Sequence, residues 1–279
     1  MKKRLGNFAV IGDPVEHSLS PKIHNLFAKQ HGNQIEYEKI RVTKGLFVAF
    51  VEDFFSNRGA GLNITLPFKS EAFEIADTLD EDSKSCQAVN TLKPVNGKLS
   101  GFNTDGVGFL TDLEAWHGIA VKDKRVLLLG AGGAAKGIVR PLLSREPKTL
   151  VIANRTQASA RALADQLNSE NFIGLEGLGL DDTQLMKKRF DIIINATSAG
   201  HKNSKMPIDE NFLEDAICYD LSYGPAASFF RWAESSGAKR SIDGLGMLIE
   251  QAAKSYESWT GFSPNTESVR ARIRNDLGI

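Results

Sequence analysis

The chain has few of the residues that build metal centres or disulfides. Only two of its 279 residues are cysteines, Cys86 and Cys218, and both lie in apolar sequence without metal-type spacing. The five histidines form no HxxxH or HxH pair, and no Gly-x-Ser-x-Gly sequence occurs. These absences argue against a metal site and against a serine hydrolase, and two unpaired thiols fit the reducing cytoplasm.

Net charge and long hydrophobic runs are also missing. Lys plus Arg and Asp plus Glu number 34 each, so the formal net charge is zero, which argues against nucleic acid or an anionic membrane as the main partner. The apolar run Phe8–Ile11 after the basic start is too short for a signal peptide, and no stretch reaches membrane-spanning length. We therefore expect a soluble cytoplasmic protein, long enough for two domains.

What stands out instead is a short apolar run followed by closely spaced glycines. Val126–Leu129 is typical of a buried parallel strand, and it leads into Gly130-x-Gly132-x-x-Ala135, the spacing of a dinucleotide-binding turn. The residues that follow have helical spacing, so a helix N-terminus would point at the turn. This context favours a nucleotide site over an ordinary glycine-rich loop. The apolar helix positions are Ala135, Ile138, Val139, Leu142 and Leu143.

Strand and helix alternate regularly after this turn, as in a doubly wound parallel sheet, the Rossmann arrangement. Further strands are predicted at Leu150–Ala153, Ile192–Asn195, Ile217–Leu221 and Arg240–Ile242. A final helix with one apolar face is predicted from Leu245 to Trp259.

The first half of the chain predicts an α/β domain of mixed strand order. Its expected helices are Pro21–Gln30 and Leu46–Phe55, and Gly106–His117 is expected to link this domain to the second. A β-hairpin is predicted around Val95–Gly97. The fold class is therefore α/β, with an N-terminal α/β domain and a Rossmann domain. The expected strands of the first domain are Phe8–Ile11, Ile35–Val42, Gly61–Thr65, Val89–Pro94 and Lys98–Phe102.

The end of the second Rossmann strand bears on which nucleotide binds. An NAD site usually has an acidic residue there, but this chain has Asn154, Arg155 and Thr156. A guanidinium pairs with phosphate in a bidentate manner, which suits the 2′-phosphate of NADP. The other interpretation is that these residues only begin the next helix, which Thr156 could cap. The sequence favours NADP over NAD.

Two serines near the N-terminus allow two interpretations that the spacing leaves open. Ser20 precedes Pro21, so it could be a helix N-cap with proline at the first helical position. Alternatively, the hydroxyls of Ser18 and Ser20 could bind a carboxylate at the helix N-terminus.

The ends of the predicted strands carry polar groups suited to an alcohol and its proton. Strand alternation places Asn63 and Thr65 on one face, which suggests a polar cleft. Lys69 follows closely; a lone lysine is usually a solvated surface charge, but beside a carboxylate it could exchange a proton with a hydroxyl. Asn90 and Asp105 also follow apolar residues at strand ends. Asp105 is either a turn residue or the carboxylate partner of Lys69.

Several of these motifs occur together in one known family. They are Ser-Leu-Ser-Pro, Asn-Ile-Thr-Leu-Pro-Phe-Lys, Ala-Val-Asn-Thr, Asn-Thr-Asp-Gly, Gly-Ala-Gly-Gly-Ala, Asn-Arg-Thr and Asp-Gly-Leu-Gly-Met-Leu, in this order. From about residue 6 to its C-terminus, the chain resembles the shikimate dehydrogenases, the NADP-dependent reductases of 3-dehydroshikimate in aromatic amino acid biosynthesis.

The resemblance implies roles for matching positions. Lys69 would be the catalytic lysine and Asp105 its partner, and Ser18 and Ser20 would bind the substrate carboxylate. Other substrate contacts would be Asn63, Thr65, Asn90, Asp105, Tyr223 and Gln251. Cofactor contacts would be Gly130, Ala131, Gly132, Gly133, Ala134, Asn154, Arg155, Thr156, Leu221 and Gly244, with Glu81 a minor one.

The resemblance also implies a discontinuous substrate domain, residues 1–105 plus 244–279, around an NADP domain at residues 106–243. The chain departs from many members at Ser159, where they have a basic residue that would help Arg155, and at Ser228, where threonine is common.

Two alternatives stay open: an enzyme that also accepts quinate or NAD, and an inactive NADP sensor. A homodimer is a further expectation that the sequence does not decide.

Overall fold

The computed structural model describes residues 4–167, 174–197 and 206–279 and divides the chain into two compact units. The first unit comprises Met1–Gly108 and Leu248–Ile279, and the second comprises Phe109–Met247. Within the described residues, no helix has the length and apolarity to cross a membrane. The α/β fold class expected from the sequence is confirmed in both units.

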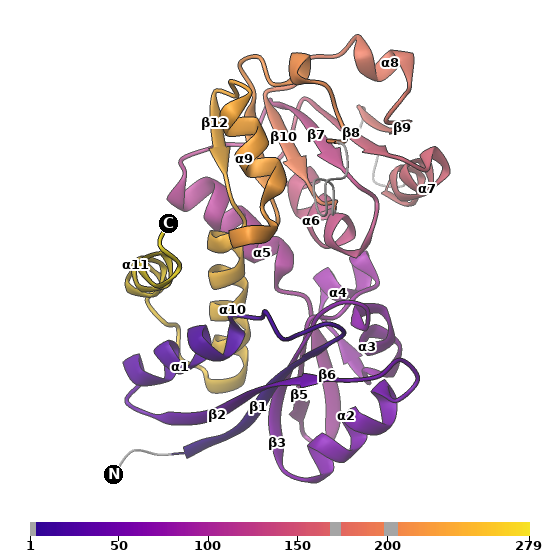
Figure 1. Ribbon diagram of the computed structural model, residues 1–279. Coiled ribbons are helices and arrows are strands. Elements are labelled where there is room, and N and C mark those ends of the chain that lie inside the picture. Colours follow the sequence, from indigo (N-terminus) through magenta and orange to yellow (C-terminus); the bar gives the residue numbers. More distant parts are fainter. Residues whose placement is uncertain (1–3, 168–173, 198–205) are drawn as a thin grey trace. The chain divides into compact units, whose positions relative to one another are not determined.

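The first unit contains a six-stranded mixed sheet in the order β2-β1-β3-β5-β6-β4 (Figure 1). Strand β1 pairs in parallel with β2 and β3, whereas β5 is antiparallel to both β3 and β6. The strands are β1 (Arg4–Gly12), β2 (Gln34–Arg41), β3 (Gly59–Ile64), β4 (Thr78–Leu79), β5 (Thr91–Val95) and β6 (Lys98–Phe102).

Helices pack on the sheet of the first unit because alternate strand residues are apolar on the face they cover. Ala9, Ile11, Leu62 and Ile64 form one core with apolar residues of α2 and α3. The helices wholly in this unit are α1 (Ser20–Gln30), α2 (Phe47–Ser56), α3 (Lys69–Ile75), α4 (Glu81–Cys86) and α11 (Thr266–Leu277); α5 (Asp105–Leu110) and α10 (Leu245–Thr260) each have one part in it.

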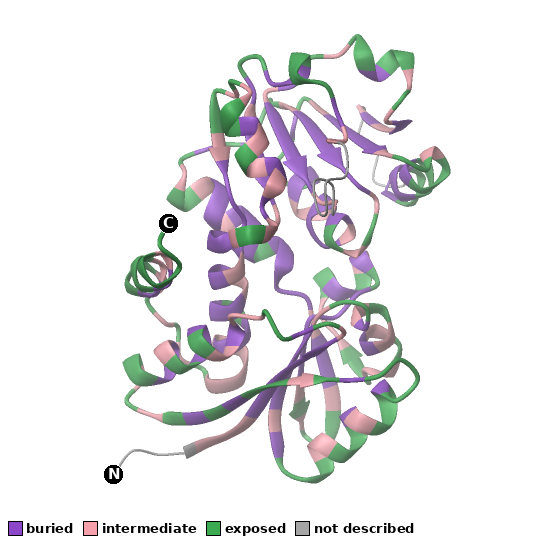
Figure 2. Ribbon diagram, in the orientation of Figure 1, coloured by how far each residue is buried: buried purple, intermediate pink, exposed green. Residues whose placement is uncertain are grey.

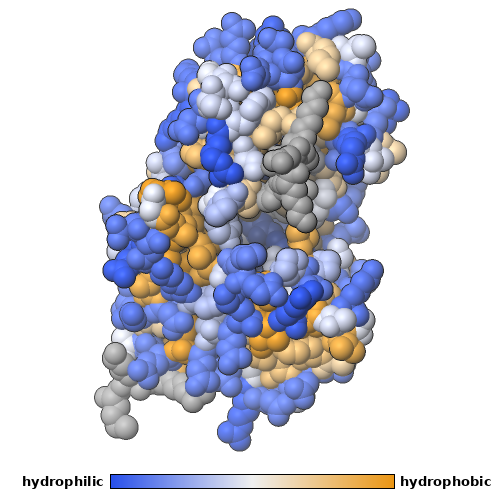
Figure 3. Space-filling view, viewed as in Figure 1, coloured by the Kyte–Doolittle hydropathy of each residue, from blue (hydrophilic) through white to orange (hydrophobic). Residues whose placement is uncertain are grey.

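Helix α2 also leaves hydrophobic side chains at the surface, where Figure 3 shows hydrophobic colouring. Val48 is 42% exposed, and Phe50, Phe54 and Phe55 are only half-buried. This helix therefore packs only part of its apolar surface into the core of its unit.

The second unit contains a six-stranded parallel sheet in the order β12-β11-β10-β7-β8-β9. The order reverses between β7 and β10, as in a doubly wound nucleotide-binding sheet. This confirms the Rossmann arrangement predicted from the glycine-rich turn. The strands are β7 (Arg125–Leu129), β8 (Thr149–Asn154), β9 (Leu175–Gly179), β10 (Ile192–Asn195), β11 (Ile217–Asp220) and β12 (Arg240–Ile242).

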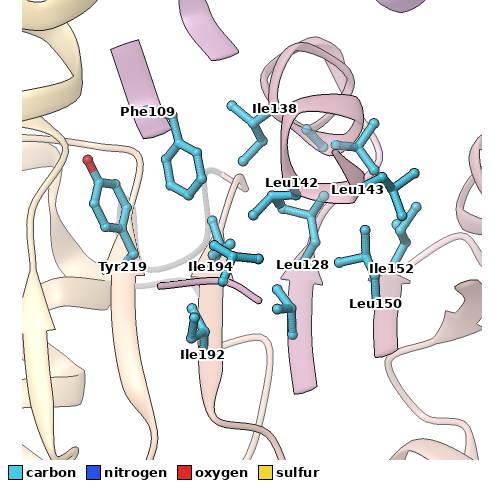
Figure 4. Packing of buried hydrophobic residues seen from close by; sticks show 14 of the residues in the cluster. Phe109, Leu128, Ile138, Leu142, Leu143, Leu150, Ile152, Ile192, Ile194 and Tyr219 are labelled. Carbon is cyan, nitrogen blue, oxygen red and sulfur yellow. The ribbon is translucent and has the colours of Figure 1, made fainter. Parts of the chain in front are cut away.

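Both faces of this parallel sheet are buried, as Figure 2 shows for its central strands. Along β7, Val126 and Leu128 belong to one core while Leu127 and Leu129 belong to the other. Figure 4 shows the first core, in which Leu128 and Ile194 pack with Ile138 and Leu142 of α6. The helices here are η1 (Thr111–Trp116), α6 (Gly133–Leu143), α7 (Gln157–Leu167), α8 (Thr183–Met186), η4 (Glu210–Phe212), η5 (Gly224–Ala226) and α9 (Ser228–Ser235).

Several local predictions are confirmed and others are corrected. The hairpin between β5 and β6 has positive φ angles at Asn96 and Gly97, as a tight two-residue turn requires. The helix predicted over Gly106–His117 is confirmed in extent, but its second half is the π-helix η1, which continues α5. There the buried Asp112 accepts a hydrogen bond from the Tyr219 hydroxyl at 2.5 Å, a tertiary contact that helical spacing does not reveal.

Candidate active site

Two charged side chains from the first unit meet at the starts of α3 and α5. Lys69 is the first residue of α3, Asp105 is the first of α5, and Lys69 Nζ donates to Asp105 Oδ2 at 2.5 Å. The lysine side chain is 18% exposed and the carboxylate 9%. A pair this buried is screened less by solvent than a surface ion pair, so its partners hold each other firmly. The structure thus brings together the lysine and carboxylate that the sequence singled out.

Asn90 fixes the other oxygen of this carboxylate. Its Nδ2 donates to Asp105 Oδ1 at 2.8 Å and to Thr104 Oγ1 at 2.9 Å, and lies 3.4 Å from Gln251 Oε1. Its Oδ1 accepts from the backbone nitrogen of Thr104 at 3.0 Å. Both carboxylate oxygens of Asp105 are therefore hydrogen-bonded. This fixes the orientation of the carboxylate and, with it, the position of the Lys69 ammonium at Oδ2.

Asn63 joins the same network from strand β3. Its Nδ2 donates to the Asn90 carbonyl and to Thr91 Oγ1 at 3.2 Å each, and to Ser255 Oγ at 3.1 Å. Its Oδ1 accepts from the Tyr37 hydroxyl at 2.6 Å. Thr65 lies just beyond the end of this strand and is half-buried. Polar groups from β3, the start of β5 and helix α10 thus form one network that reaches the Lys69–Asp105 pair through Asn90.

Several members of this network were missed in the sequence. Thr91, Thr104 and Ser255 are buried hydroxyl residues, and Tyr37 is a buried phenol. Ser255 lies four residues after Gln251 on α10, a spacing that places both side chains on one helix face. That spacing was the available clue, but serine and threonine are too common for it to have been decisive.

The structure corrects the capping interpretation of Ser20. Helix α1 begins at Ser20 itself, its N-cap position is Leu19, and no side-chain cap hydrogen bond forms. Ser18 Oγ instead accepts from the Ser20 backbone nitrogen at 3.2 Å and lies 3.1 Å from Ser20 Oγ. The two hydroxyls therefore lie side by side at the N-terminus of the helix.

The second unit places the glycine-rich turn between β7 and α6. Gly130 has φ +105°, a conformation that strains any residue with a Cβ. Gly132 is the N-cap of α6, where no side chain caps the first turn, and a Cβ at Gly132 or Gly133 would meet nothing within 4 Å. The partial positive charge of the helix N-terminus thus faces open space, which suits the pyrophosphate of a dinucleotide. Ala131 and Ala134 complete the turn.

The other cofactor candidates lie at the carboxyl ends of neighbouring strands. Asn154 ends β8, and the exposed residues Arg155 and Thr156 follow it, so a guanidinium is available for a phosphate. Leu221 follows β11. A Cβ at Gly244 would lie 2.2 Å from the carbonyl oxygen of Leu221, so the backbones of Leu221 and Gly244 are in close contact. These positions belong to one edge of one sheet, where doubly wound folds bind ligands.

Two further candidates are Glu81 and Tyr223. Glu81 is the first residue of α4 in the first unit, is 83% exposed, and pairs with Lys84 at 2.7 Å. Tyr223 is half-buried in the second unit, just before η5. Within the described ranges, no group of three His, Cys, Asp or Glu side chains could hold a metal ion.

Comparison with known proteins identifies the family to which this geometry belongs. A family model described as the shikimate dehydrogenase substrate binding domain matches residues 10–92. Models described as shikimate/quinate 5-dehydrogenase and as the shikimate 5′-dehydrogenase C-terminal domain match residues 114–211 and 244–274. The chain belongs to the shikimate dehydrogenase family.

Individual relatives share most of their length with this chain. A protein from Methylobacillus flagellatus named shikimate dehydrogenase (NADP(+)) is 44% identical over 271 residues, 97% of this chain and 99% of its own. The crystal structure of an Ael1 enzyme from Pseudomonas putida has a TM-score of 0.87 at 40% identity, covering 96% of this chain and 98% of that one. The Thermus thermophilus shikimate 5-dehydrogenase, solved with NADP(H) and shikimate, has a TM-score of 0.84 at 32% identity, covering 96% and 98%.

A cysteine close to the Lys69–Asp105 pair gives a prediction on thiol reactivity. Burial raises the pKa of Cys86 to about 11, and the Asp105 charge adds to this rise; burial alone raises the pKa of Cys218 to about 12. Because the thiolate is the nucleophile, about a thousandth of the Cys86 thiol is reactive at pH 8. We expect neither thiol to react with a disulfide reagent in the native protein at pH 8, and both to react at once in guanidinium chloride. Rapid labelling of the native protein at pH 8 would contradict this.

Proposed function

We propose that this protein is an NADP-dependent shikimate dehydrogenase, which interconverts 3-dehydroshikimate and shikimate in the biosynthesis of chorismate and aromatic amino acids. The observation that carries the proposal is the 2.5 Å contact between Lys69 Nζ and Asp105 Oδ2, within a network of amide and hydroxyl groups, in a chain of this family. A ketone and its alcohol need such a group to supply and remove a proton.

The reduction adds one hydride and one proton across the ketone. NADPH, when bound, supplies the hydride to the carbonyl carbon. Lys69 donates a proton from Nζ to the oxygen as it becomes an alkoxide, and in the reverse direction it accepts that proton from the hydroxyl. Asp105 holds the lysine and accepts a hydrogen bond from a neighbouring substrate hydroxyl.

The remaining groups of the first unit would bind the rest of the substrate. Ser18 and Ser20 offer two hydroxyl donors to its carboxylate at the N-terminus of α1. Amide and hydroxyl groups that both donate and accept suit the ring hydroxyls. These are Asn63, Thr65, Asn90 and Gln251, with Tyr223 as a further contact.

The second unit would bind the cofactor. Gly130–Ala134 and the uncapped start of α6 suit its pyrophosphate, and Arg155, with Asn154 and Thr156, suits the 2′-phosphate. Leu221 and Gly244 would lie beside the nicotinamide, and Glu81 would add a minor contact. We accordingly assign residues 1–105 plus 244–279 to the substrate domain and 106–243 to the NADP domain.

The same proposal extends to cellular context. The two free cysteines are buried and unpaired, as expected in a reducing cytoplasm. The zero net charge provides no overall electrostatic attraction to nucleic acid or anionic membranes. A homodimer is consistent with the hydrophobic surface of α2.

An absorbance assay at 340 nm with purified protein, shikimate and NADP⁺ tests the function. We expect NADPH to form with shikimate and much less with quinate, and NADP⁺ to be preferred over NAD⁺. Comparable turnover of quinate or NAD⁺ would favour the broader enzyme. No reduction of either nucleotide with either substrate would favour the inactive NADP sensor and contradict the proposal.

Replacing Arg155 tests the cofactor assignment. Charged hydrogen bonds contribute about 1.5–3 kcal/mol, so Arg155→Ala should raise the KM for NADP⁺ by roughly 10- to 100-fold. The kcat/KM for NAD⁺ should change by less than about threefold, because NAD⁺ lacks the 2′-phosphate. Arg161→Ala, an exposed arginine on the following helix, is the matched control. Equal losses with both nucleotides would show that Arg155 does not bind the 2′-phosphate.

A further inference from the structure

A buried carboxylate of the second unit has no part in the function proposed above. Asp220 is the last residue of β11 and is only 1% exposed. Its Oδ1 accepts from Asn195 Nδ2 at 3.1 Å and from the backbone nitrogen of Ser222 at 3.0 Å. Its Oδ2 accepts from the backbone nitrogen of Phe230 at 3.1 Å. Three N–H donors thus converge on this side chain, which suits an ionised carboxylate because that group only accepts hydrogen bonds.

Two of these donors belong to opposite ends of one loop. The β11–α9 loop, residues 221–227, joins the strand to helix α9. Ser222 lies near the start of the loop, and Phe230 lies in the first turn of α9, whose N-cap residue Ala227 makes no side-chain hydrogen bond. Asp220 supplies the acceptor that this helix start lacks, so it ties both ends of the loop to the end of the strand.

Asn195, at the end of the neighbouring strand β10, fixes the direction of this carboxylate. Asn195 Oδ1 accepts from the backbone nitrogen of Thr197 at 3.1 Å and from its hydroxyl at 2.6 Å. The amide oxygen is therefore turned towards Thr197, and Nδ2 is turned towards Asp220. The backbone carbonyl of Asn195 also accepts from the backbone nitrogen of Leu221 at 3.0 Å. One residue of β10 thus holds both the carboxylate and the first residue of the loop.

Further contacts hold the loop along its length. The backbone nitrogen of Gly244 donates to the carbonyl oxygen of Ser222 at 2.9 Å. The exposed Arg231 donates from Nη1 to the Gly224 carbonyl at 3.0 Å and from Nη2 to the Pro225 carbonyl at 2.9 Å. The loop is therefore held by Asp220 at its base and by Arg231 at the surface of the second unit.

The charge on Asp220 is costly to bury. Burial raises the pKa of its carboxyl above the usual range, and the hydrogen bonds from Ser222, Phe230 and Asn195 only partly offset that rise. A raised pKa means that folding disfavours the ionised form, so at neutral pH this charge lowers the free energy of unfolding. Stability alone therefore does not account for a carboxylate at this position.

We propose that Asp220 is a positioning residue, which acts through the β11–α9 loop to place Leu221 and Tyr223 for the reaction. This inference rests on the proposed function, in which Leu221 lies beside the nicotinamide and Tyr223 contacts the substrate. Hydride transfer depends on how its two partners are placed, and an error of about 1 Å can cost about 100-fold in rate. Loss of the Asp220 contacts should lower kcat, while the cofactor phosphates remain bound at Gly130 and Arg155.

The first test is Asp220→Asn, which keeps the size of the side chain. An amide has one acceptor atom, so its NH₂ group must face either Phe230 or the pair of Asn195 and Ser222, donor against donor. We expect kcat for shikimate oxidation to fall about 10- to 100-fold and the KM for shikimate to rise about threefold.

Binding of 2′-phospho-ADP-ribose, which is NADP⁺ without its nicotinamide, separates positioning from folding. Its Kd for Asp220→Asn, measured by calorimetry, should stay within about twofold of the unchanged protein because it does not reach Leu221. The stoichiometry gives the folded fraction, by which kcat is corrected. A purely structural role would weaken this binding together with kcat, or leave the corrected kcat unchanged, and either result would overturn the proposal.

Asp191→Asn is the matched control. Asp191 also accepts three hydrogen bonds, from the Arg125 backbone nitrogen at 2.7 Å, from Nε at 3.1 Å and from Nη2 at 2.7 Å. It lies just before β10, at the opposite edge of the same sheet from the β11–α9 loop. We expect this variant to have a lower Tm but a kcat within about twofold. A fall in kcat as large as that of Asp220→Asn would show that the loss reflects the stability of the whole unit, against the proposal.

Arg231→Ala keeps the test decisive if Asp220→Asn does not fold. It removes two hydrogen bonds from the exposed side of the loop and leaves the buried groups in place. We expect kcat to fall about threefold, with unchanged binding of 2′-phospho-ADP-ribose; an unchanged kcat would overturn the proposal. If the unchanged enzyme does not oxidise shikimate, the proposed function fails. If it does and Asp220→Asn matches it, only this inference fails.

Discussion

The buried contact between Lys69 and Asp105 is the constraint around which the first unit is arranged. It joins residues 36 positions apart, and each is the first residue of a helix that follows a strand of the same sheet. An ammonium and a carboxylate in a largely buried place need hydrogen bonds from all sides. Asn90 supplies one to Asp105, and its own amide is held by Thr104. The polar network around the pair is what makes its burial stable.

The two units divide the chemistry according to the type of sheet each contains. The parallel sheet of the second unit is buried on both faces, so polar groups gather at its carboxyl edge, around Gly130 and Arg155. The mixed sheet of the first unit admits polar residues on one face, where Tyr37 and Asn63 lie among the residues of α1 and α10. In the proposed function, the cofactor phosphates would therefore be bound by a backbone turn, and the proton would be transferred by side chains.

Features set by local physics could be predicted from the sequence. The turn after Leu129 has a glycine at φ +105° between an apolar strand and a helix with one apolar face. The strand, the glycine and the helix follow one another directly in the sequence, so local patterns reveal all three. The hairpin at Asn96 and Gly97 is equally local. Lys69 and Asp105 could be singled out because they follow strands. Their pairing was one of two interpretations that the residues allowed for Asp105, and the family resemblance favoured it.

Features set by tertiary contacts could not be predicted. Strand β9 contains Gly177 and Gly179, which weaken the strand pattern, and β4 has only two residues. Helix α11 is largely exposed, and the start signal at Asn265, whose side chain accepts from Ser268 N, was overlooked. Ser20 resembles an N-cap in sequence, but the helix includes it, and its hydroxyl accepts a hydrogen bond from Ser18 Oγ at 3.1 Å. Whether such a segment forms a strand or a helix, and what its side chains contact, depends on which side chains lie across the sheet.

The central claim, that Lys69 transfers the proton, is tested most directly by single-turnover kinetics. Lys69→Met would be mixed with NADPH and 3-dehydroshikimate in a stopped-flow instrument, with the exposed Lys98→Met as control and shikimate binding measured by calorimetry. General acid catalysis contributes about 10²- to 10⁴-fold, so the account predicts a chemical step slower by at least about 100-fold, with binding within about tenfold and the control unchanged. A Lys69→Met protein that binds shikimate normally and oxidises NADPH at nearly the full rate would contradict it.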